Sequence, residues 1–496
     1  MCRAMQRKKI PSFKIRLGVT TLVLTMSTAM LAGSEGFPGK STAPPPGVPV
    51  EYQGPLPSMA ALNIRNARFE TLLADLDEPW AIEFCGRDEL LLTQIRGRLN
   101  RYRMSTRELI PIRGLPKIES GKEQTGLLDI ECHPDFPENR KIYFSYVRSD
   151  AETGRFYQTV IASAVLIGQE LADVRELVAS HPQGWSPANF GGALEFDGDG
   201  LLFISIGDRS DHIFAQEGQR LEGKILRLKD DGSVPEDNPF LDDHEIDDRI
   251  YALGVRNPQG LHYDQVTDTL LEVEHGPLGG DEINIILAGA NYGWPTITYG
   301  LNYTTEKIGV GTHMEGLRQP IWYYLPSIAA SPITVYRGAM FPEWEGDVLI
   351  GALKGQHVSK LDLDGIQVRS EHAFLSELGD RIRDIKVHPD GSIYILGQTT
   401  GLHRLYRAEN QASETPPFDA QLGYDLFCSG CHDTGAASAP LLGDRAAWFE
   451  VLKRPRDVVY RRVFAGAGGM PERGLCHICS DEQLKAITDY MLDGEQ

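Results

Sequence analysis

The chain has 496 residues and a formal net charge of −20, from 49 Lys and Arg against 69 Asp and Glu. A surface this acidic repels a polyanion, which excludes nucleic acid as a partner. Hydrophobic residues make up 41% of the chain and charged residues 24%, which excludes a largely disordered protein. The length indicates more than one domain.

The N-terminus predicts an export signal over residues 1–33. Six basic residues fall within the first 16 positions, and Leu17 to Gly33 follows without a charged residue. A retained membrane anchor is the alternative, although this apolar run is at the lower end of the length that crosses a bilayer. We expect the rest of the chain in the periplasm, where its six further cysteines meet oxidising conditions.

Two linkers divide what remains. Residues 34–63 are rich in proline, which favours an extended tether, and residues 409–417 (ENQASETPP) are polar and end in two prolines. We therefore expect a large domain over residues 64–408 and a small domain over residues 418–496.

A repeat predicts the fold of the large domain. Six times an apolar strand runs into a polar turn and a second apolar strand leaves it, with these residues at the end of the first strand: Phe84, Cys132, Phe196, Tyr263, Phe341 and His388. The spacing leaves room for about four strands in each unit, and such units stack around an axis. The pattern predicts an all-β six-bladed β-propeller. Two β-sandwich domains are the alternative, but they would not explain the recurring turns.

The small domain contains the most specific motif, Cys428-Ser-Gly-Cys431-His432. Two thiols at this spacing can form thioethers with a haem, and the adjacent imidazole then binds the iron. A thioredoxin-like redox pair is the alternative for the two cysteines. Met470, followed by proline, is the expected sixth iron ligand, with Met491 as a less favoured substitute. The segment resembles a class I monohaem cytochrome c, which implies a small all-α domain that carries haem c.

A second cysteine pair, Cys476 and Cys479, is not followed by histidine and so cannot attach another haem in this way. We expect a local disulfide, with half of a zinc site as the alternative. Cys85 and Cys132 end the first strands of neighbouring repeats. We expect a bridge between them as well, the alternative being two buried thiols.

Several separated segments of the large domain share another likeness. They are QTGLLDIECHPDF from Gln124, NFGGALEFDGDGLLFISIGDRSD from Asn189, GVRNPQG from Gly254, EHGPLGGDEINIILAGANYGWP from Glu274 and RIRDIKVHPDG from Arg381. Together they resemble the soluble aldose sugar dehydrogenase, or glucose/sorbosone dehydrogenase, family over residues 70–406. The resemblance implies a six-bladed propeller that holds pyrroloquinoline quinone (PQQ) and calcium.

The resemblance also implies a set of cofactor contacts. Arg256 and Asn257 match the pair that reaches the quinone carbonyls, so Arg256 is expected in the reaction itself, and five further residues match other PQQ contacts: Gln124, Gln216, Lys354, Arg381 and Arg383. PQQ is a planar tricarboxylate, and guanidinium groups both pair with carboxylates and stack on flat rings. An ordinary charged surface is the alternative for the arginines.

Calcium is expected at a glycine-rich loop. By the same resemblance, backbone carbonyls of Gly276 and Pro277 contact the calcium of the cofactor, while Asp281, Glu282 and the Tyr292 carbonyl bind a structural calcium. Hard oxygen ligands suit this ion. A solvated acidic turn is the alternative.

One position departs from the family. Its members have a histidine ahead of the Gly191-Gly192 step that accepts the proton of the substrate hydroxyl, whereas this chain has Asn189. A carboxamide can bind a hydroxyl but has no pKa suited to taking its proton. His181 and His212 are the candidates to serve instead.

Three functions remain open from the sequence. The first is a periplasmic PQQ-dependent dehydrogenase that oxidises a sugar or another alcohol and passes electrons to its own haem and on to a periplasmic or membrane acceptor. The second is a haem electron-transfer or sensory protein whose propeller only binds a ligand or partner, which Asn189 favours. The third is a calcium-dependent hydrolase, which the haem domain argues against.

Overall fold

The structure is a computed structural model that describes residues 67–149, 156–182, 186–407, 420–476 and 479–493. The expected export signal and both linkers lie outside these residues. By its internal contacts the chain divides between Ala408 and Glu409 into two compact units. No helix among the described residues combines the length and the apolar character needed to span a bilayer.

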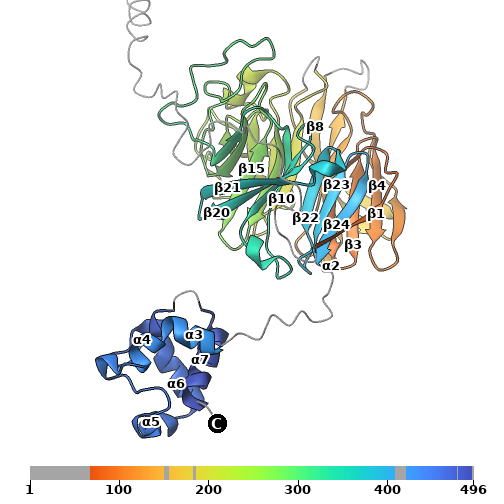
Figure 1. Ribbon diagram of the computed structural model, residues 1–496. Coiled ribbons are helices and arrows are strands. Elements are labelled where there is room, and N and C mark those ends of the chain that lie inside the picture. The colour runs from red at the N-terminus through yellow and green to blue at the C-terminus, as the bar shows by residue number, and fades with distance from the viewer. Residues whose placement is uncertain (1–66, 150–155, 183–185, 408–419, 477–478, 494–496) are drawn as a thin grey trace, which may run out of the picture. The chain divides into compact units, whose positions relative to one another are not determined.

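The first unit contains six antiparallel sheets of four strands each (Figure 1). Five of them take consecutive strands: β2–β5 (Pro79–Gly86, Glu89–Gln94, Arg98–Arg103, Glu108–Ile112), β6–β9 (Leu127–Cys132, Lys141–Arg148, Gln158–Ile167, Glu170–Ala179), β10–β13 (Gly191–Phe196, Leu202–Ile206, Lys224–Leu228, Ile250–Leu253), β14–β17 (Pro258–Asp264, Thr269–Glu274, Asp281–Ile286, Trp322–Tyr324) and β18–β21 (Ala330–Val335, Val348–Ala352, Val358–Asp364, Gln367–Phe374).

The sixth sheet joins the two ends of the unit. Strands β22 (Ile382–Val387), β23 (Ile393–Gly397) and β24 (Gly401–Arg407) are completed by β1 (Ala67–Leu73), which pairs with β24 in a register that sets Ala67 opposite Arg407. Strand β1, from the start of the unit, therefore completes the last blade. This pairing joins the two ends of the unit, so the ring has no gap between its first and last blades. The sequence repeats did not reveal this exchange.

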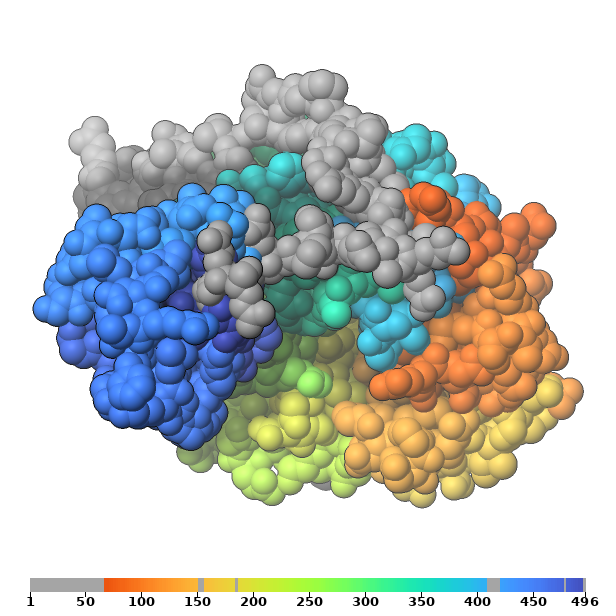
Figure 2. Space-filling view, turned by 60° about the horizontal axis from the view of Figure 1, so that its bottom comes forward, coloured from red at the N-terminus to blue at the C-terminus, as the bar shows by residue number. Residues whose placement is uncertain are grey.

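The sheets follow one another around a ring in chain order (Figure 2). Their first strands, β2, β6, β10, β14, β18 and β22, are the innermost, and each contacts the first strands of both neighbouring blades. The six-bladed β-propeller is confirmed. One predicted repeat boundary was wrong: Phe341 lies between β18 and β19, because the first strand of the fifth blade ends earlier, at Val335.

Apolar runs explain why the strands pack face to face. All five residues of β11 are buried. In β9, the outermost strand of its blade, buried and exposed residues alternate little, and most residues in the middle of the strand are exposed. Apolar clusters combine residues of neighbouring blades, for example Leu91 and Ile112 with Ile142 and Phe144. The core of this unit thus lies between the blades, and the ring axis is left to polar side chains.

The second unit is all-α, as predicted. It contains α3 (Ala420–Phe427), α4 (Ser429–His432), α5 (Arg445–Leu452), α6 (Arg456–Ala465) and α7 (Asp481–Asp493), and α3 packs against α7. The apolar spacing of α7 buries Leu484, Ile487 and Met491 on one face.

Both expected disulfides are present. Cys85 at the end of β2 is bonded to Cys132 at the end of β6, with Cα atoms 5.6 Å apart, so this bridge ties the first blade to the second. Cys476 and Cys479 form the local bridge, with Cα atoms 5.5 Å apart. Pairing leaves neither cysteine of the second bridge as a free thiolate for zinc.

Candidate functional site

Three arginines converge at the end of the propeller where the innermost strands begin. Arg381 and Arg383, one on each side of Ile382 at the start of β22, share one acceptor, Gln398 Oε1, at 2.8 Å and 2.9 Å. Arg256 precedes β14 and donates from its guanidinium to the carbonyls of His275 and Gly276 at 2.7 Å and 3.0 Å.

His275 marks the centre of this group. Burial, and then the charges of Arg256, Arg383 and Arg381, lower the pKa of His275 to about 3, so its ring is neutral. Its Nε2 atom is buried and has no hydrogen-bond partner among the described residues. The Asn257 Nδ2 amide donates to His275 Nδ1 at 3.5 Å, so the proton of the neutral ring lies on Nε2. An unfilled donor among three cations fits an anionic ligand.

Aromatic faces complete the arginine group. The Arg383 guanidinium lies 4.4 Å from the ring centre of Trp80, and the Arg256 guanidinium lies 5.4 Å from that of Trp294. Burial, and then the charge of Arg381, lower the pKa of Arg383 to about 9. A pocket with several desolvated cations and flat apolar walls suits a planar polycarboxylate.

Lys354 and Gln216 have different surroundings. Lys354 is exposed and follows Leu353, whose carbonyl accepts from Arg381 at 3.4 Å, so the lysine adds a cation beside this arginine. Gln216 is occupied within the protein, because its amide group pairs with Asn291 at 2.8 Å and donates to the Trp294 carbonyl at 2.7 Å. Gln216 thus holds the loop that carries Trp294, and the structure does not present its amide to a ligand.

Asn189 is held in a fixed orientation. Its Nδ2 atom donates to Asp208 Oδ1 at 2.9 Å, and Asp208 Oδ2 accepts from the Trp294 indole at 2.9 Å. Because a carboxylate only accepts hydrogen bonds, Asn189 must turn its amide nitrogen toward Asp208, which leaves Oδ1 as its free acceptor. Gln124 completes the arrangement by accepting from the Asn189 backbone N–H at 2.8 Å.

Arg209 supports the same loop and was missed in the sequence. It is buried, its guanidinium lies 3.5 Å from the Phe190 ring centre, and it donates to the carbonyls of Ser186 and Ala188. It therefore fixes the backbone ahead of Asn189. The signal in the sequence was the run Gly207-Asp208-Arg209, in which two charged residues follow an apolar strand. Charged residues in a loop at such a place often have a functional role.

Neither alternative histidine is bonded to this network. His181 lies 3.5 Å from Glu222, and its side chain is 45% exposed. His212 is exposed, and its ring centre is 6.4 Å from that of Trp294 in an edge contact. Only His212 therefore lies beside a residue of the network, at its solvent side.

The calcium residues separate into two groups. The Asp281 carboxylate accepts from the Gly276 N–H at 2.9 Å, the Ser327 hydroxyl at 2.9 Å and the Ala330 N–H at 3.1 Å. The Gly276 carbonyl also accepts from Arg256, so protein donors bind an acceptor at each of these two positions. Asp281 and Glu282 also begin β16 rather than forming a loop.

Glu282 and Tyr292 line a cavity of about 10 Å³ together with Glu274, Gly276 and Arg256, with room for one water or ion. Burial, and then the charge of Glu274, raise the pKa of Glu282 well above its usual range. The buried Oε1 of Glu272 and Oδ1 of Asn284 have no hydrogen-bond partner among the described residues. The part of the chain that the structure describes includes no group of three acidic, His or Cys side chains that could hold a metal ion. A calcium ion here would therefore depend on carbonyl or water oxygens as well.

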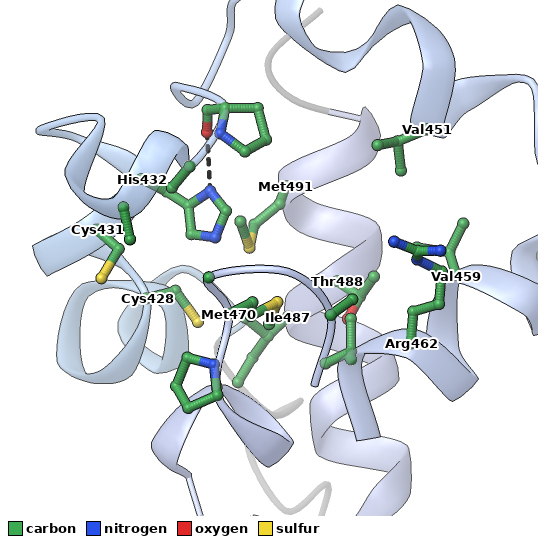
Figure 3. Close-up of a pocket in the computed structure, with 18 of the residues that line it drawn as sticks. Cys428, Cys431, His432, Val451, Val459, Arg462, Met470, Ile487, Thr488 and Met491 are labelled. Atoms are coloured by element: carbon green, nitrogen blue, oxygen red, sulfur yellow. Dashed lines mark hydrogen bonds between the residues drawn. The ribbon is translucent and has the colours of Figure 1, made fainter. Parts of the chain in front are cut away.

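The second unit contains a separate, mainly apolar cavity of about 280 Å³ (Figure 3). Cys428 and Cys431 line it as free thiols on either side of the start of α4. His432 ends α4 and is buried, and its Nδ1 atom forms a 2.8 Å hydrogen bond with the Pro440 carbonyl. This bond requires a proton on Nδ1, so Nε2 is the unprotonated nitrogen that can bind a metal.

Two methionines line the same cavity. Met470 is half-buried in the turn ahead of Pro471, whereas Met491 is buried in α7 as part of the apolar core with Leu484 and Ile487. Figure 3 shows both sulfur atoms in the cavity that the His432 ring enters. Met470 therefore remains the predicted sixth ligand of the haem iron, since it does not belong to the apolar core that Met491 helps to form.

Comparisons with known proteins agree with both halves of the chain. Residues 76–407 match the family model for glucose/sorbosone dehydrogenase, and residues 419–491 match that for cytochrome c oxidase, cbb3-type, subunit III. Cytochrome c5 of Azotobacter vinelandii is 40% identical over 67 residues, 13% of this chain and 81% of that protein.

Three relatives resemble the propeller. Aldose sugar dehydrogenase YliI of Escherichia coli is 37% identical over 334 residues, 66% of this chain and 89% of that protein. Quinoprotein glucose dehydrogenase B of Acinetobacter calcoaceticus is 25% identical, covering 67% of this chain and 85% of its own length. The apo-form crystal structure of the soluble aldose sugar dehydrogenase from Escherichia coli has a TM-score of 0.65 at 36% identity, over 69% of this chain and all of that one. By its fold and by the family model that spans most of its length, this chain belongs to the glucose/sorbosone dehydrogenase family and has a C-terminal cytochrome c domain.

Proposed function

We propose that this protein is a periplasmic dehydrogenase that oxidises a sugar or another alcohol at a PQQ group in the propeller and passes the electrons to haem c in its second unit. The observation that carries the proposal is the convergence of Arg256, Arg381 and Arg383 around the unfilled Nε2 of His275. The name of the quinoprotein relative and those of the aldose sugar dehydrogenases support the same reading.

The residues present fit the quinone. Arg381, Arg383 and Lys354 would pair with its carboxylates, while Trp80 offers a flat surface beside them. Arg256 and Asn257 would face the reactive carbonyls, and the Asn257 side chain is held in place by the Gly191 N–H, which donates to its Oδ1 at 3.3 Å. When bound, PQQ supplies a two-electron acceptor for the hydride of a carbinol carbon.

The residues of this chain would do the rest. Asn189 Oδ1, turned outward by Asp208, would accept a hydrogen bond from the substrate hydroxyl and orient the C–H bond. Asn189 cannot take the hydroxyl proton, so this proton would pass first to a water molecule within the site or to His212 beside Trp294. Loss of a positioned base costs about 10²- to 10⁴-fold in rate, so we expect a slow enzyme.

The haem domain would receive the electrons. Cys428 and Cys431 would form the thioethers, with His432 and Met470 as iron ligands, and a periplasmic or membrane protein would accept the electrons next. Calcium is part of the proposal at Glu282 and Tyr292, where a second buried carboxylate, that of Glu274, lines the same small cavity and favours a cation.

A reconstitution tests the proposal. Purified protein is loaded with PQQ and calcium and offered aldoses and simple alcohols, while haem absorbance reports electron arrival. Reduction of the haem by at least one substrate is the expected result. Quinone that fails to bind the wild-type protein would reject the proposal.

A matched pair of variants tests the role of Asn189. Asn189→His is expected to raise the rate of haem reduction by about 10²-fold or more, whereas Asn189→Ala lowers it. If the wild type binds PQQ but reduces no haem with any substrate, while Asn189→His does, the native propeller is silent and the protein is an electron-transfer or sensory protein.

A further inference from the structure

Six polar side chains form one layer around the axis of the propeller. This layer lies further along the innermost strands than the arginine site. Each lies near the end of an innermost strand, at matching positions of the strand pairing: Glu83, Glu131, Glu195, His262, Thr334 and Lys386. Three carboxylates, one imidazole and one ammonium thus meet in one layer. The mechanism above uses none of them.

Contacts within this layer are close. Lys386 Nζ lies 2.6 Å from Glu83 Oε2 and 3.9 Å from Glu131 Oε2. Glu195 Oε1 accepts from the Tyr263 N–H at 2.9 Å and lies 3.7 Å from the His262 ring. Glu131 is nine-tenths buried, and its Oε2 has no hydrogen-bond partner among the described residues. One lysine therefore serves several carboxylates, too few positive charges to balance them all.

Two further carboxylates lie one layer nearer the arginine site. Asp384, two residues before Lys386, accepts from the Ile82 N–H of β2 at 2.7 Å, and Asp129, two residues before Glu131, accepts from the Leu194 N–H of β10 at 2.8 Å. Each thus reaches across to a neighbouring blade. Asp384 is buried and Asp129 is half-buried.

Two cavities extend these layers, one toward the arginine site and the other toward the opposite face of the propeller. A cavity of about 30 Å³ brings Trp80 and Arg383 of the arginine site together with Asp129, Asp384 and Lys386, and it has room for at least one water molecule. A second cavity, of about 390 Å³, contains Glu83, Glu131 and Glu195 and is lined by the turns that follow the innermost strands. The ionisable groups therefore form a column from the proposed quinone to the opposite face of the propeller.

These carboxyls can exchange protons near neutral pH. Burial raises the pKa of Asp129 to about 6, of Asp384 to about 7 and of Glu195 to about 8, with Lys386 partly opposing each shift. Burial and then the charge of Glu83 raise the pKa of Glu131 as well.

The remaining charged neighbours do not take part in this exchange. Burial works against the ammonium of Lys386, but the charges of Glu83 and Glu131 outweigh it and raise its pKa. Burial and then the charge of Lys386 lower the pKa of His262 to about 3, so this ring stays neutral. Asp264, further along β14, is held in an ion pair by Arg337 at 2.6 Å. Thr334, on β18, has no charge.

The proposed reaction creates a need for such a column, and this step rests on the proposed function. Oxidation of one carbinol carbon to a carbonyl releases two electrons and two protons. The electrons leave one at a time through the haem iron, which changes from ferric to ferrous and takes up no proton. Both protons must therefore leave the propeller in every turnover, and Asn189 cannot carry them.

We propose that the axial column of Asp384, Asp129, Glu131, Glu195 and Glu83, gathered around the Lys386 ammonium, conducts these protons from the cofactor site to the opposite face of the propeller. Protons move between neighbouring carboxyls and intervening water, and they leave through the cavity beyond Glu195. The cofactor face then stays free for substrate to enter and product to leave.

Removing carriers tests the column. In the variants Glu131→Gln and Asp384→Asn, proton release after a single turnover, followed with a dissolved pH indicator, is expected to slow by about 100-fold. Glu170→Gln, at the exposed edge of β9, is the matched control and leaves the rate unchanged. PQQ affinity, titrated without substrate, is expected to be the same in all of these proteins.

A readout without turnover makes the result independent of activity and of folding defects. In the infrared spectrum of the wild-type apoprotein, bands of protonated carboxyls are expected at pH 6, to shift in D₂O, and to fade toward pH 9. A folded Glu131→Gln protein lacks part of this signal. Absence of such bands in the wild type would overturn the proposal even if no variant could be purified.

The exit side is tested with attached dyes. A pH-sensitive dye on Asp199→Cys, in the turn after β10, is expected to respond before the same dye on Gln356→Cys, in the turn after β19 at the cofactor face. The reverse order, or equal release rates in wild type and Glu131→Gln, overturns the column. If the wild type binds no PQQ, the proposed function fails, which the affinity titration identifies separately.

Discussion

The two sites of this protein are built in opposite ways. The haem attachment motif comes from one short stretch, in which Cys428, Cys431 and His432 are neighbours on a single turn and Pro440 orients the imidazole only eight residues later. The arginine site gathers residues from Trp80 to Gln398, which come from several blades and loops. A local site depends on its own turn, whereas a distributed site depends on closure of the whole ring, which β1 completes by pairing with β24.

The largest effect should come from the local site. Changing both Cys428 and Cys431 to serine removes the thioethers, so we expect complete loss of covalently bound haem, measured in denatured protein. Ser429→Ala is the control and should retain the haem. PQQ affinity should not change, because the propeller is a separate compact unit. Loss of PQQ binding in the double variant would contradict the independence of the two sites.

Axial ligation tests which methionine completes the haem site. Met470→Ala should lower the haem reduction potential by roughly a few tenths of a volt, since a thioether ligand favours ferrous iron. Met491→Ala should mainly destabilise the apolar core to which it belongs. Potentiometric titration of both variants decides the assignment. A large potential shift in Met491→Ala alone would transfer the sixth ligand to that residue.

The disulfides offer the same comparison for stability. In the chain-entropy model a bridge with a sequence separation of 47, as in Cys85–Cys132, contributes about 4 kcal/mol, and one with a separation of 3, as in Cys476–Cys479, about 2 kcal/mol. Denaturant unfolding of alanine variants of each pair, followed separately for the two units, measures both. Equal losses of the free energy of unfolding in the two variants would show that the Cys85–Cys132 bridge stabilises its unit no more than the local Cys476–Cys479 bridge does.

Single changes in the distributed site should have moderate effects. Arg383→Leu removes one desolvated cation, so PQQ should bind roughly 10- to 150-fold more weakly, or about 1.5–3 kcal/mol. Arg404→Leu, on strand β24 between β23 and β1 and paired with Asp390, is the matched control. Affinity is measured by quenching of protein fluorescence. Equal affinities for both variants would place the quinone elsewhere.

The smallest effect concerns acid stability. His262 has a folded pKa of about 3, lowered by burial and then by Lys386. Below its unfolded pKa the unfolded chain binds a proton that the folded chain does not, so the free energy of unfolding falls as pH decreases through 6.5. His262→Gln should therefore gain about 2 kcal/mol relative to wild type between pH 7 and pH 5. Exposed His212→Gln serves as control, and an unchanged difference for His262→Gln would contradict the burial argument.

Much of the molecule could be predicted from its sequence. The strand repeats were enough for six blades, because each unit carries its own apolar strands and polar turn. The motif at Cys428 located the haem domain, and both disulfides were confirmed. The repeat at Phe341 was misplaced because an apolar residue in a long connection resembles a strand end. Gln216 and Asp281 lie where expected, but their side chains bind other protein groups.

By itself, the sequence determined the strand-turn-strand units that repeat in the blades and the chemistry of the haem motif, since both depend on residues close together in the chain. Only the tertiary structure decided which distant residues share a site. It set His275 among three arginines, turned Asn189 toward Asp208 and gathered Glu83, Glu131 and Lys386 around the axis. The physical reason is that ring closure brings the innermost strands of all six blades to one axis, and no local pattern records which of their side chains will meet there.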